Sequence, residues 1–395
     1  MGSAGRKKSV WRTIHRGLGI GLGVWFALVG ITGSILVYED PIDAWLNPGL
    51  LVDRHEGPWL RPHEILERAD REYPHARIER LRLPAARGEV YRLQLIAAPS
   101  RRSESPRIEA TFSPVTGELL GNRETESLAF SAPHLLKTVY EFHRNVLLGA
   151  AGSNIVGVAG LLMLTSVVTG LAVAWPRSRS GWRQVVSVKL RAGGTRVLFD
   201  FHRSTGSVLF ALVLVSTVTG STLVYINYVR EIVGVFSSVD AFPTIPWRRI
   251  PYDQWPEFRE IVKNVRDAYP SRAVAEIHIP SQPAAGYLFY LRGPADVHRL
   301  GDTIVWVHPA TGEILIERSD RNRTRGETLM HWLFPLHSGS AFGRYGMVAM
   351  CLAGVLPVFL ALTGLWVWLQ KRCAEKFESR RSARLQTEFA ARAKG

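Results

Sequence analysis

Residues 14–38 read IHRGLGIGLGVWFALVGITGSILVY, and residues 201–225 read FHRSTGSVLFALVLVSTVTGSTLVY. In both stretches a histidine, His15 or His202, precedes a Thr-Gly-Ser triplet by 17 residues. The residues between are largely apolar, and their number approaches the ~20 residues that a membrane-spanning helix needs. The two stretches therefore predict two related spans, each with a histidine at its start.

A second pair of stretches repeats with its own spacing. His143 precedes Thr169-Gly170 by 26 residues, and His337 precedes Thr363-Gly364 by the same 26. Glycines stand 6, 9 and 17 residues after each histidine, at 149, 152 and 160 and at 343, 346 and 354. Self-similarity of this kind indicates an internal duplication. Because a histidine at the entrance of a membrane helix is costly without a partner, the four histidines are candidate functional residues.

Four apolar windows are long enough to cross a bilayer, at about 18–38, 155–175, 207–228 and 346–368. The first window exceeds the apolar core of a signal peptide and has no small-residue cleavage site after it. We therefore expect an uncleaved anchor there.

The formal net charge of +15 is concentrated beside these windows. Three basic clusters carry it: Arg6, Lys7, Lys8, Arg12 and Arg16; Arg177, Arg179, Arg183, Lys189, Arg191, Arg196 and Arg203; and Lys371, Arg372, Lys376, Arg380, Arg381 and Arg384. All three fall on one side of the membrane if the four spans form, which is the positive-inside pattern and places both termini in the cytoplasm. An RNA-binding tail is the alternative, but topology accounts for every cluster, and we expect no nucleic-acid partner.

The predicted fold is a membrane α-helical protein with a four-helix transmembrane bundle and two external α+β domains, in an internal duplication. Its segments are 1–38 (cytoplasmic N-terminus and first span), 39–142 (first external domain), 143–176 (second span), 177–201 (cytoplasmic loop), 202–228 (third span), 229–336 (second external domain), 337–370 (fourth span) and 371–395 (basic cytoplasmic tail). The halves are parallel repeats, because each begins and ends inside. Gly17/Gly21 and Gly152/Gly160 are predicted at helix interfaces, where small residues let membrane helices approach closely.

Each external segment predicts a helix followed by a small antiparallel sheet. A proline opens each helix, Pro62 or Pro256, and a Tyr-Pro pair at 73–74 or 269–270 closes it. Alternating apolar runs predict strands at 77–83, 90–96 and 108–113, and at 273–279, 287–291 and 303–308. Thr-Gly-Glu then follows at 116–118 and at 311–313. Glycine at that place allows the positive φ of a tight hairpin turn.

The four repeated histidines predict two haem sites. His15 and His202 lie at the cytoplasmic starts of the first and third spans, and His143 and His337 lie on the external side before the second and fourth. Haem iron accepts two axial imidazoles, and facing helices of a bundle can supply them. Because no Cys-x-x-Cys-His motif is present, we expect two non-covalent haem b groups. One near each face would form an electron path across the bilayer.

Three arginines follow these histidines directly. Arg16, Arg144 and Arg203 are expected to pair with haem propionates, because a guanidinium group binds a carboxylate through two parallel hydrogen bonds. As continuous helices, residues 143–175 and 337–368 would be ~48 Å long, which exceeds the ~30 Å hydrocarbon core. The external pair is therefore expected at or above the lipid headgroups.

Other interpretations of the histidines remain open. They could be interfacial residues that only cap helices, whereas a zinc site is disfavoured because no cysteine or carboxylate stands at metal-ligand spacing near the pairs. His134 and His331 have no histidine counterpart in the other half and are less certain haem contacts, with substrate contact or plain surface as alternatives. The remaining histidines are expected on the solvated surface: His55, His63, His75, His278, His298 and His308.

The chain resembles the PepSY-associated transmembrane helix family of bacterial inner-membrane proteins and, within it, the siderophore reductases of the ferrioxamine type. The motifs that carry the resemblance are Ile14-His15-Arg16-Gly17-Leu18-Gly19, Phe142-His143-Arg144, Asp200-Phe201-His202-Arg203 and Leu336-His337-Ser338-Gly339. The resemblance implies two haems, PepSY-like domains in the periplasm, and reduction of ferric siderophores on that side of the inner membrane.

The function expected on this basis is that of a membrane-embedded oxidoreductase. A quinol or a cytoplasmic reductant supplies the electron, and a ferric siderophore accepts it. Arg321, Arg323 and Arg325 could attract an anionic chelate, although solvated loop charge explains them as well. Two alternatives are a membrane-tethered PepSY-type regulator or peptidase inhibitor without redox activity, and an electron-transfer subunit that serves another reductase.

Overall fold

The computed structural model describes residues 3–97, 106–176, 178–239, 256–280 and 286–392. Arg177, which belongs to the basic clusters above, lies outside these residues. The chain divides into two compact units. Residues 1–35, 143–224 and 348–395 make up the first, called here the helical unit, and residues 36–142 and 225–347 make up the second, called here the sheet unit. Each unit is therefore assembled from segments that are far apart in the sequence.

The helical unit is built from long apolar helices. They are α1 (Ser3–Val37), α6 (Gly149–Ala174), α8 (Gly194–Val208), α9 (Phe210–Val224) and α13 (Gly343–Arg392), with the short α7 (Gly181–Val186) between α6 and α8. Three helical segments of the described residues are long and apolar enough to cross a membrane: Val10–Val37, Gly149–Ala174 and Ser340–Ser382. A fourth is present if α8 and α9, which are bent by 60° relative to each other, form one span.

That bend differs from the continuous third span expected at 207–228. Helix α8 ends at Val208, Leu209 breaks the pattern, and α9 begins at Phe210. Gly206 and Ser207 stand directly before the break, and a Gly/Ser pair is a common cause of helix kinks. The chain breaks again at Tyr225, after which α10 (Ile226–Phe236) belongs to the sheet unit.

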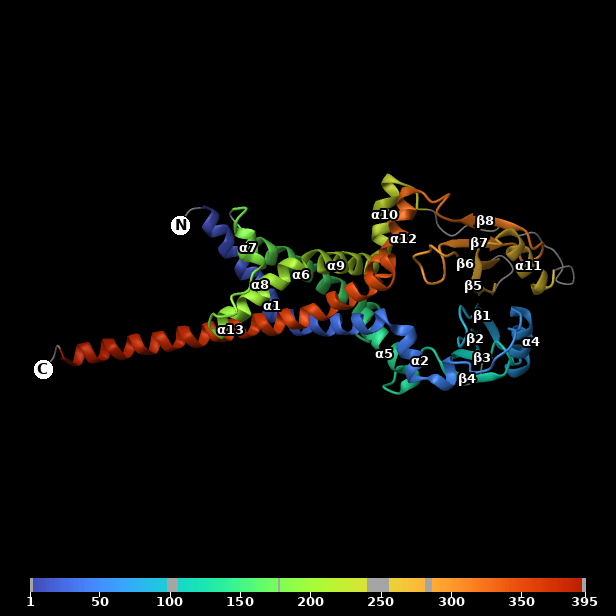
Figure 1. Ribbon diagram of the computed structural model, residues 1–395, viewed down its shortest axis with the longest axis horizontal. Helices are drawn as coiled ribbons and strands as arrows, with labels where there is room; N and C mark the ends of the chain where they lie inside the picture. The colour runs from blue at the N-terminus through green and yellow to red at the C-terminus, as the bar shows by residue number, and fades with distance from the viewer. Residues whose placement is uncertain (1–2, 98–105, 177, 240–255, 281–285, 393–395) are drawn as a thin grey trace. The chain divides into compact units, whose positions relative to one another are not determined.

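Small residues bring the long helices together. A Cβ atom added to Gly30 of α1 would collide with the carbonyl of Gly354 on α13, and Ser34 donates to the Cys351 carbonyl at 2.8 Å. Figure 1 shows α1 and α13 running side by side. Helices α6 and α9 meet where a Cβ atom on Gly160 would lie 2.5 Å from the Ser221 hydroxyl oxygen. Close contact at glycine and serine is the usual way in which membrane helices pack.

The other glycines predicted at helix interfaces lie elsewhere. Nothing in the described residues comes within 4 Å of a Cβ atom added to Gly17 or Gly21. Gly152 instead packs against the Asn145 carbonyl of the turn that precedes its own helix. The spacing of glycines shows where a helix can be approached, but it does not show which helix approaches.

One eight-stranded antiparallel sheet forms the centre of the sheet unit, in the order β4-β3-β2-β1-β5-β6-β7-β8. The strands are β1 (Arg77–Arg82), β2 (Tyr91–Ile96), β3 (Arg107–Phe112), β4 (Leu119–Glu124), β5 (Ala273–His278), β6 (Tyr287–Arg292), β7 (Thr303–Val307) and β8 (Ile314–Arg318). The alternating apolar runs predicted the first three strands of each half to within about one residue. Gly117 and Gly312 have φ angles of 70° and 68°, which confirms the predicted turn glycines.

The two external sheets expected from the sequence are thus joined into one. Strand β1 pairs with β5 through Arg80↔His278, Leu81↔Ile277 and Arg82↔Glu276. The Leu83 amide donates to the Ala275 carbonyl, and the Ile279 amide donates to the Glu79 carbonyl, both at 2.9 Å. An edge strand exposes unpaired backbone groups and favours pairing with another edge. Alternation within a strand does not reveal that partner.

Two helices cover one face of this sheet. Helix α4 (Pro62–Glu72) packs on the half made by β1–β4 and α11 (Phe258–Ala268) packs on the half made by β5–β8 (Figure 1). Leu83 and Phe258 contact the hydrophobic clusters of both halves, so the core continues across the β1/β5 junction. Both helices end where predicted, at Tyr73 and Tyr269.

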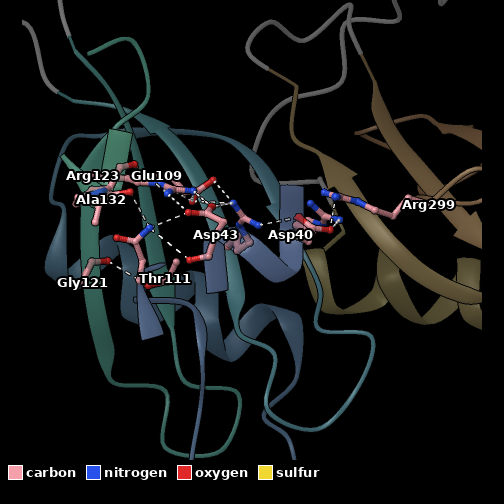
Figure 2. A network of polar contacts seen from close by, with 12 residues as sticks. Asp40, Asp43, Glu109, Thr111, Gly121, Arg123, Ala132 and Arg299 are labelled. Atoms are coloured by element: carbon pink, nitrogen blue, oxygen red, sulfur yellow. Dashed lines mark hydrogen bonds and ion pairs between the residues drawn. The ribbon is translucent and has the colours of Figure 1, made fainter. Parts of the chain in front are cut away.

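A network of buried and half-buried charges covers the opposite face of the first half (Figure 2). Arg123 contacts Asp43 at 2.7 Å and Glu109 at 2.9 Å, and Arg92 contacts Glu109 at 3.0 Å. Asp43 lies on α2 (Glu39–Leu46), which follows α1 after a single residue and is followed by α3 (Pro48–Leu51). The network therefore fixes the segment that leaves the first span against β2, β3 and β4. Asp40 of α2 also pairs with Arg299 from the β6–β7 loop.

Candidate functional site

Three of the four repeated histidines rest on a Thr-Gly pair of a neighbouring helix. His15 of α1 lies against α6, where its Nδ1 is 2.9 Å from the Ser166 carbonyl oxygen. A Cβ atom on Gly170 would be 2.8 Å from Cε1 of the His15 ring, closer than real Cβ atoms approach. Only glycine leaves room for the ring at this position of α6.

His202 of α8 lies against α13 in the same way. Its Nδ1 is 3.0 Å from the Thr363 hydroxyl oxygen, and a Cβ atom on Gly364 would be 3.2 Å from the His202 ring. The Thr363 hydroxyl donates its own hydrogen to the Phe359 carbonyl at 2.8 Å. It can therefore only accept from His202, so Nδ1 of this ring carries the proton.

His143 of α5 (Ala132–Asn145) lies against α1. Its Nδ1 is 3.0 Å from the Val29 carbonyl oxygen and 3.2 Å from the Thr32 hydroxyl. A Cβ atom on Gly33 would lie 2.9 Å from Cε1 of this ring. The Thr32-Gly33 pair thus contacts His143 as Thr363-Gly364 contacts His202, whereas His15 contacts Gly170 and the Ser166 carbonyl without a contact to Thr169 in the described residues.

This arrangement fixes the chemistry of each ring. A carbonyl oxygen can only accept, so a histidine that contacts one through Nδ1 has its proton there and an unprotonated Nε2. Histidines that bind metals are commonly oriented through a hydrogen bond from their other nitrogen. All three rings are therefore held in the tautomer that offers Nε2 as a ligand.

His15 and His202 form a pair. Their ring centres are 6.1 Å apart and their planes are inclined by 68°. Two imidazoles that bind one metal from opposite sides, with metal–nitrogen bonds of about 2 Å, have their centres roughly 6 Å apart. Edge-to-face contact between two rings gives a similar separation, so the distance is compatible with both arrangements.

Glycine also stands one helical turn beyond each ring of this pair. Residues i and i+4 lie on the same helix face, which places Gly19 beside His15 and Gly206 beside His202. A Cβ atom on Gly19 would meet nothing within 4 Å in the described residues, and one on Gly206 would meet only Leu360, at 3.7 Å. Two oriented imidazoles with small residues beside them fit the axial ligation of a flat macrocycle such as haem.

The remaining predicted ligands lie in the sheet unit. His337 is on α12 (Arg325–Ser338), close to the end of that helix at Gly339. His134 is on α5, about two and a half turns before His143, so the two side chains point to opposite sides of the helix. His134 contacts Ser131 through Nδ1 at 3.1 Å, and its buried Nε2 has no hydrogen-bond partner among the described residues.

Helices α5 and α12 are separate from the spans that follow them, so the continuous helices considered at 143–175 and 337–368 do not form. Val146 and Leu147 have φ angles of 51° and 63°, and α6 starts only at Gly149. In the second half of the chain, Gly339 has a φ of 83°, and a short 3-10 helix at 340–342 separates α12 from α13. Left-handed backbone ends an α-helix, and its position was not evident from composition.

The arginines proposed as propionate partners differ in their contacts. Arg16 and Arg144 are exposed. The guanidinium group of Arg203 instead donates to the carbonyls of Gln184, Val185 and Ser187 around the end of α7, and it pairs with the buried Asp200 at 3.0 Å. Arg203 thus anchors α7 to α8.

Two histidines expected at the surface are buried or clustered. His308 is 5% exposed and accepts the Ala310 amide at 3.1 Å through Nδ1, which orders the β7–β8 turn. The rings of His298 and His331 have centres 4.2 Å apart and planes inclined by 47°, and His331 Nε2 lies 3.1 Å from an oxygen of Asp302. Sequence reasoning missed this grouping because its members come from a loop and a helix far apart in the chain.

The local electrostatics of that group favour a charged carboxylate and a neutral ring. Burial alone would raise the pKa of Asp302, but hydrogen bonds from His331 and from the amides of Val297 and His298 lower the pKa to about 2. Burial lowers the pKa of His298, although a hydrogen bond to the His331 carbonyl partly opposes it. At neutral pH Asp302 is ionised and His298 is uncharged.

Comparison with known families gives one match. The model of the family described as the PepSY-associated TM region matches residues 12–371. This range includes the apolar helices and the two long segments between them, 39–142 and 229–336. No curated protein matches the chain.

Proposed function

We propose that this chain, which belongs to the PepSY-associated TM family, is an oxidoreductase of the bacterial inner membrane that delivers electrons to ferric siderophores in the periplasm. The apolar helices support a membrane protein. The observation that carries the redox proposal is the pair of His15 and His202, each held through Nδ1 and separated by 6.1 Å between ring centres.

The chain's part in this function is to hold and orient ligands. Ser166 and Thr363 fix the two rings so that Nε2 is the available nitrogen. Gly170 of α6 and Gly364 of α13 leave room for the two rings. A haem b held by such a pair would supply one-electron transfer. The polarity of the surrounding side chains would set the reduction potential of a haem bound there.

A second haem site is proposed at His143 and His337. His143 is oriented through Nδ1 as the first pair is. The sequence repeat relates His337 to His143, because both precede glycines and a Thr-Gly pair at equal spacing. In the proposed four-helix bundle the basic flanks lie in the cytoplasm, and this second site lies toward the periplasm. The propionate groups would then pair with Arg16 and Arg144.

The proposed substrate is Fe(III) bound to an anionic chelator. One electron, drawn from a quinol or a cytoplasmic reductant, converts Fe(III) to Fe(II), and the oxygen donors that suit the hard ferric ion hold Fe(II) less tightly. The iron then leaves the chelator. Arg321 and Arg325, in the segment before and at the start of α12, are the proposed attraction for the negative charge of the chelate.

The experiment that tests this function is absorption spectroscopy of the purified full-length protein. Soret and α bands from two haems per chain are expected. His15→Ala and His202→Ala should each remove one haem and leave the other, because both residues would hold the same haem. His63→Ala, on α4 of the sheet unit, is the matched control and should keep both.

Three outcomes separate the alternatives. A colourless protein after expression with ample haem supply would favour a membrane-tethered regulator and reduce the His15–His202 pair to an edge contact. A haem protein that is reduced by dithionite but not reoxidised by ferric siderophore would favour an electron-transfer subunit. Reoxidation by ferrioxamine, with release of Fe(II) to a ferrous chelator, supports the reductase.

A further inference from the structure

We propose that His298, Asp302 and His331 form a binding site for a divalent first-row transition ion, separate from the proposed haem sites. The three residues are called the loop–helix cluster here. His298 and Asp302 belong to the loop between β6 and β7, and His331 belongs to α12. One ligand atom from each residue can be chosen so that all three lie within 4.8 Å of one another.

The distances suit a shared ion. Two ligand atoms that each lie about 2.1 Å from one metal, at 90° to 110° from each other, are roughly 3.0–3.4 Å apart. His331 Nε2 and the nearer Asp302 oxygen are 3.1 Å apart. His298 points its Nε2 at the His331 carbonyl, 2.9 Å away, which places the proton there and leaves Nδ1 as the nitrogen with a free lone pair.

The carboxylate is held rigidly before any ion arrives. One Asp302 oxygen accepts the Val297 amide at 2.8 Å and the other accepts the His298 amide at 3.1 Å. The Asp302 amide in turn donates to Asp296 at 2.8 Å. Such outer hydrogen bonds orient the ligands of metal sites. Asp302 is 3% exposed, whereas His298 and His331 are only half-buried, so the cluster remains open on the histidine side.

The loop can adopt this shape only because of Gly301. Its φ is 103°, and a Cβ atom there would collide with the carbonyl of Leu291 on β6. The tight backbone turn brings Asp302 back over His298. Phe334, one turn after His331 on α12, stacks on the His298 ring with planes inclined by 18°. The His298 ring is thus restrained by a residue outside the cluster, and the His331 ring is restrained by Asp302 within it.

Two imidazoles and one carboxylate indicate the class of ion. Nitrogen donors favour zinc and the later first-row ions over magnesium or calcium, and a set of three protein ligands leaves at least one position for water or another ligand. Binding would replace the hydrogen bond between His331 and Asp302, because the ring proton moves to Nδ1 when Nε2 takes the ion. Arg323, which donates to the Asp302 carbonyl, adds a nearby positive charge that weakens the site without blocking it.

A simpler interpretation is that the His331–Asp302 pair only ties the loop to α12. The sheet unit contains a matched example of that arrangement. His278 Nε2 pairs with Glu276 at 2.7 Å on β5, and no third His, Cys, Asp or Glu completes a ligand group with them in the described chain. If a histidine–carboxylate pair were enough to bind the ion, both places would bind it.

Isothermal titration of the full-length protein with Zn²⁺ tests the proposal. One binding site for Zn²⁺ per chain is expected. His298→Gln and His331→Gln should each weaken Zn²⁺ binding roughly tenfold or more. His278→Gln should leave the affinity unchanged. The circular dichroism and haem spectra of all three variants report whether the fold is retained.

Several results would overturn this site. Equal Zn²⁺ affinity in the wild type and in a folded His298→Gln/His331→Gln variant would show that the ion binds elsewhere. Loss of one haem in His331→Gln would make that residue a haem ligand instead. The titration measures zinc affinity and not haem content. The zinc site can therefore be confirmed if the haem proposal fails, and the haem proposal can be confirmed if the zinc site fails.

Discussion

At the scale of single residues, the functional proposal rests on glycines that accommodate histidine rings. Gly33, Gly170 and Gly364 each lie under an imidazole that a side chain would displace. Each follows a threonine, and Thr32 and Thr363 also contact the ring nitrogen. The ring therefore packs against the Thr-Gly pair. The glycine leaves room for the ring, and the helical turn before the pair supplies the oxygen that accepts the Nδ1 hydrogen bond.

Gly170→Ala should lower the haem content at the His15 site. Replacing glycine by alanine in a helix usually stabilises it by ~1 kcal/mol, but here the new Cβ atom would lie 2.8 Å from the His15 ring and push it off its acceptor. We expect the ratio of haem to protein to fall from two toward one, measured by pyridine haemochrome assay. Gly17→Ala, on an exposed face of α1, is the control. Equal ratios of haem to protein in the two variants would show that the room left by Gly170 is not needed for haem binding.

At the scale of elements, the junction between β1 and β5 makes one sheet from two halves. Only three residue pairs are in register across it. Glu276 faces Arg82 there and also binds His278. Burial by itself would raise the pKa of Glu276, but the hydrogen bond and charge of His278 and the charges of Arg82 and Arg80 lower it overall. The ionised carboxylate thus stabilises the junction.

Glu276→Gln should loosen this junction in a pH-dependent way. A carboxyl group whose pKa is lowered on folding contributes stability above its unfolded pKa of about 4.3, and this contribution is lost as the pH falls through the lower folded value. We expect faster hydrogen exchange of the Leu83 and Ile279 amides at pH 7, equivalent to a loss on the order of 1 kcal/mol, and little difference from wild type in strong acid. Glu313→Gln, exposed at the β7–β8 turn, should change neither amide. A pH-independent difference would contradict the charge argument.

At the scale of the whole molecule, the chain passes repeatedly between the two units. The changes fall at 35/36, 142/143, 224/225 and 347/348. Basic clusters lie in the first turns of α1 ahead of its apolar part, in the segment that runs from the end of α6 into α8, and after the apolar part of α13. This order is consistent with both termini in the cytoplasm.

The two cysteines can test this topology without engineered labels. Cys373 is exposed on α13 and follows the charged pair Lys371-Arg372, whereas Cys351 lies within the apolar residues 346–368. A charged, membrane-impermeant maleimide should label Cys373 in inverted vesicles and not in intact spheroplasts, since it cannot cross the hydrocarbon layer. Cys373→Ser should abolish the labelling. Labelling of Cys373 from the outside of spheroplasts would reverse the proposed orientation.

The sequence alone determined the parts of the protein that depend on local pattern. Apolar runs located the long helices, alternation located β1–β3 and β5–β7, and the turn glycines Gly117 and Gly312 have the predicted positive φ. The repeated spacing also selected the histidines that the helical unit brings onto Thr-Gly pairs. These features arise from hydrophobicity, strand pleat and backbone sterics over a few neighbouring residues, which a single sequence records directly.

Only the tertiary structure decided what those parts contact. It placed His15 of α1 against Ser166 of α6, 151 residues away in the chain, and it joined β1 to β5. It also ended helices before α6 and inside the third apolar window, and it brought His298, Asp302 and His331 together. Each of these depends on complementary shape or hydrogen bonding between distant segments. Such pairing is selected by the packing of the folded chain, so it leaves no periodic signal in the sequence from which it could be predicted.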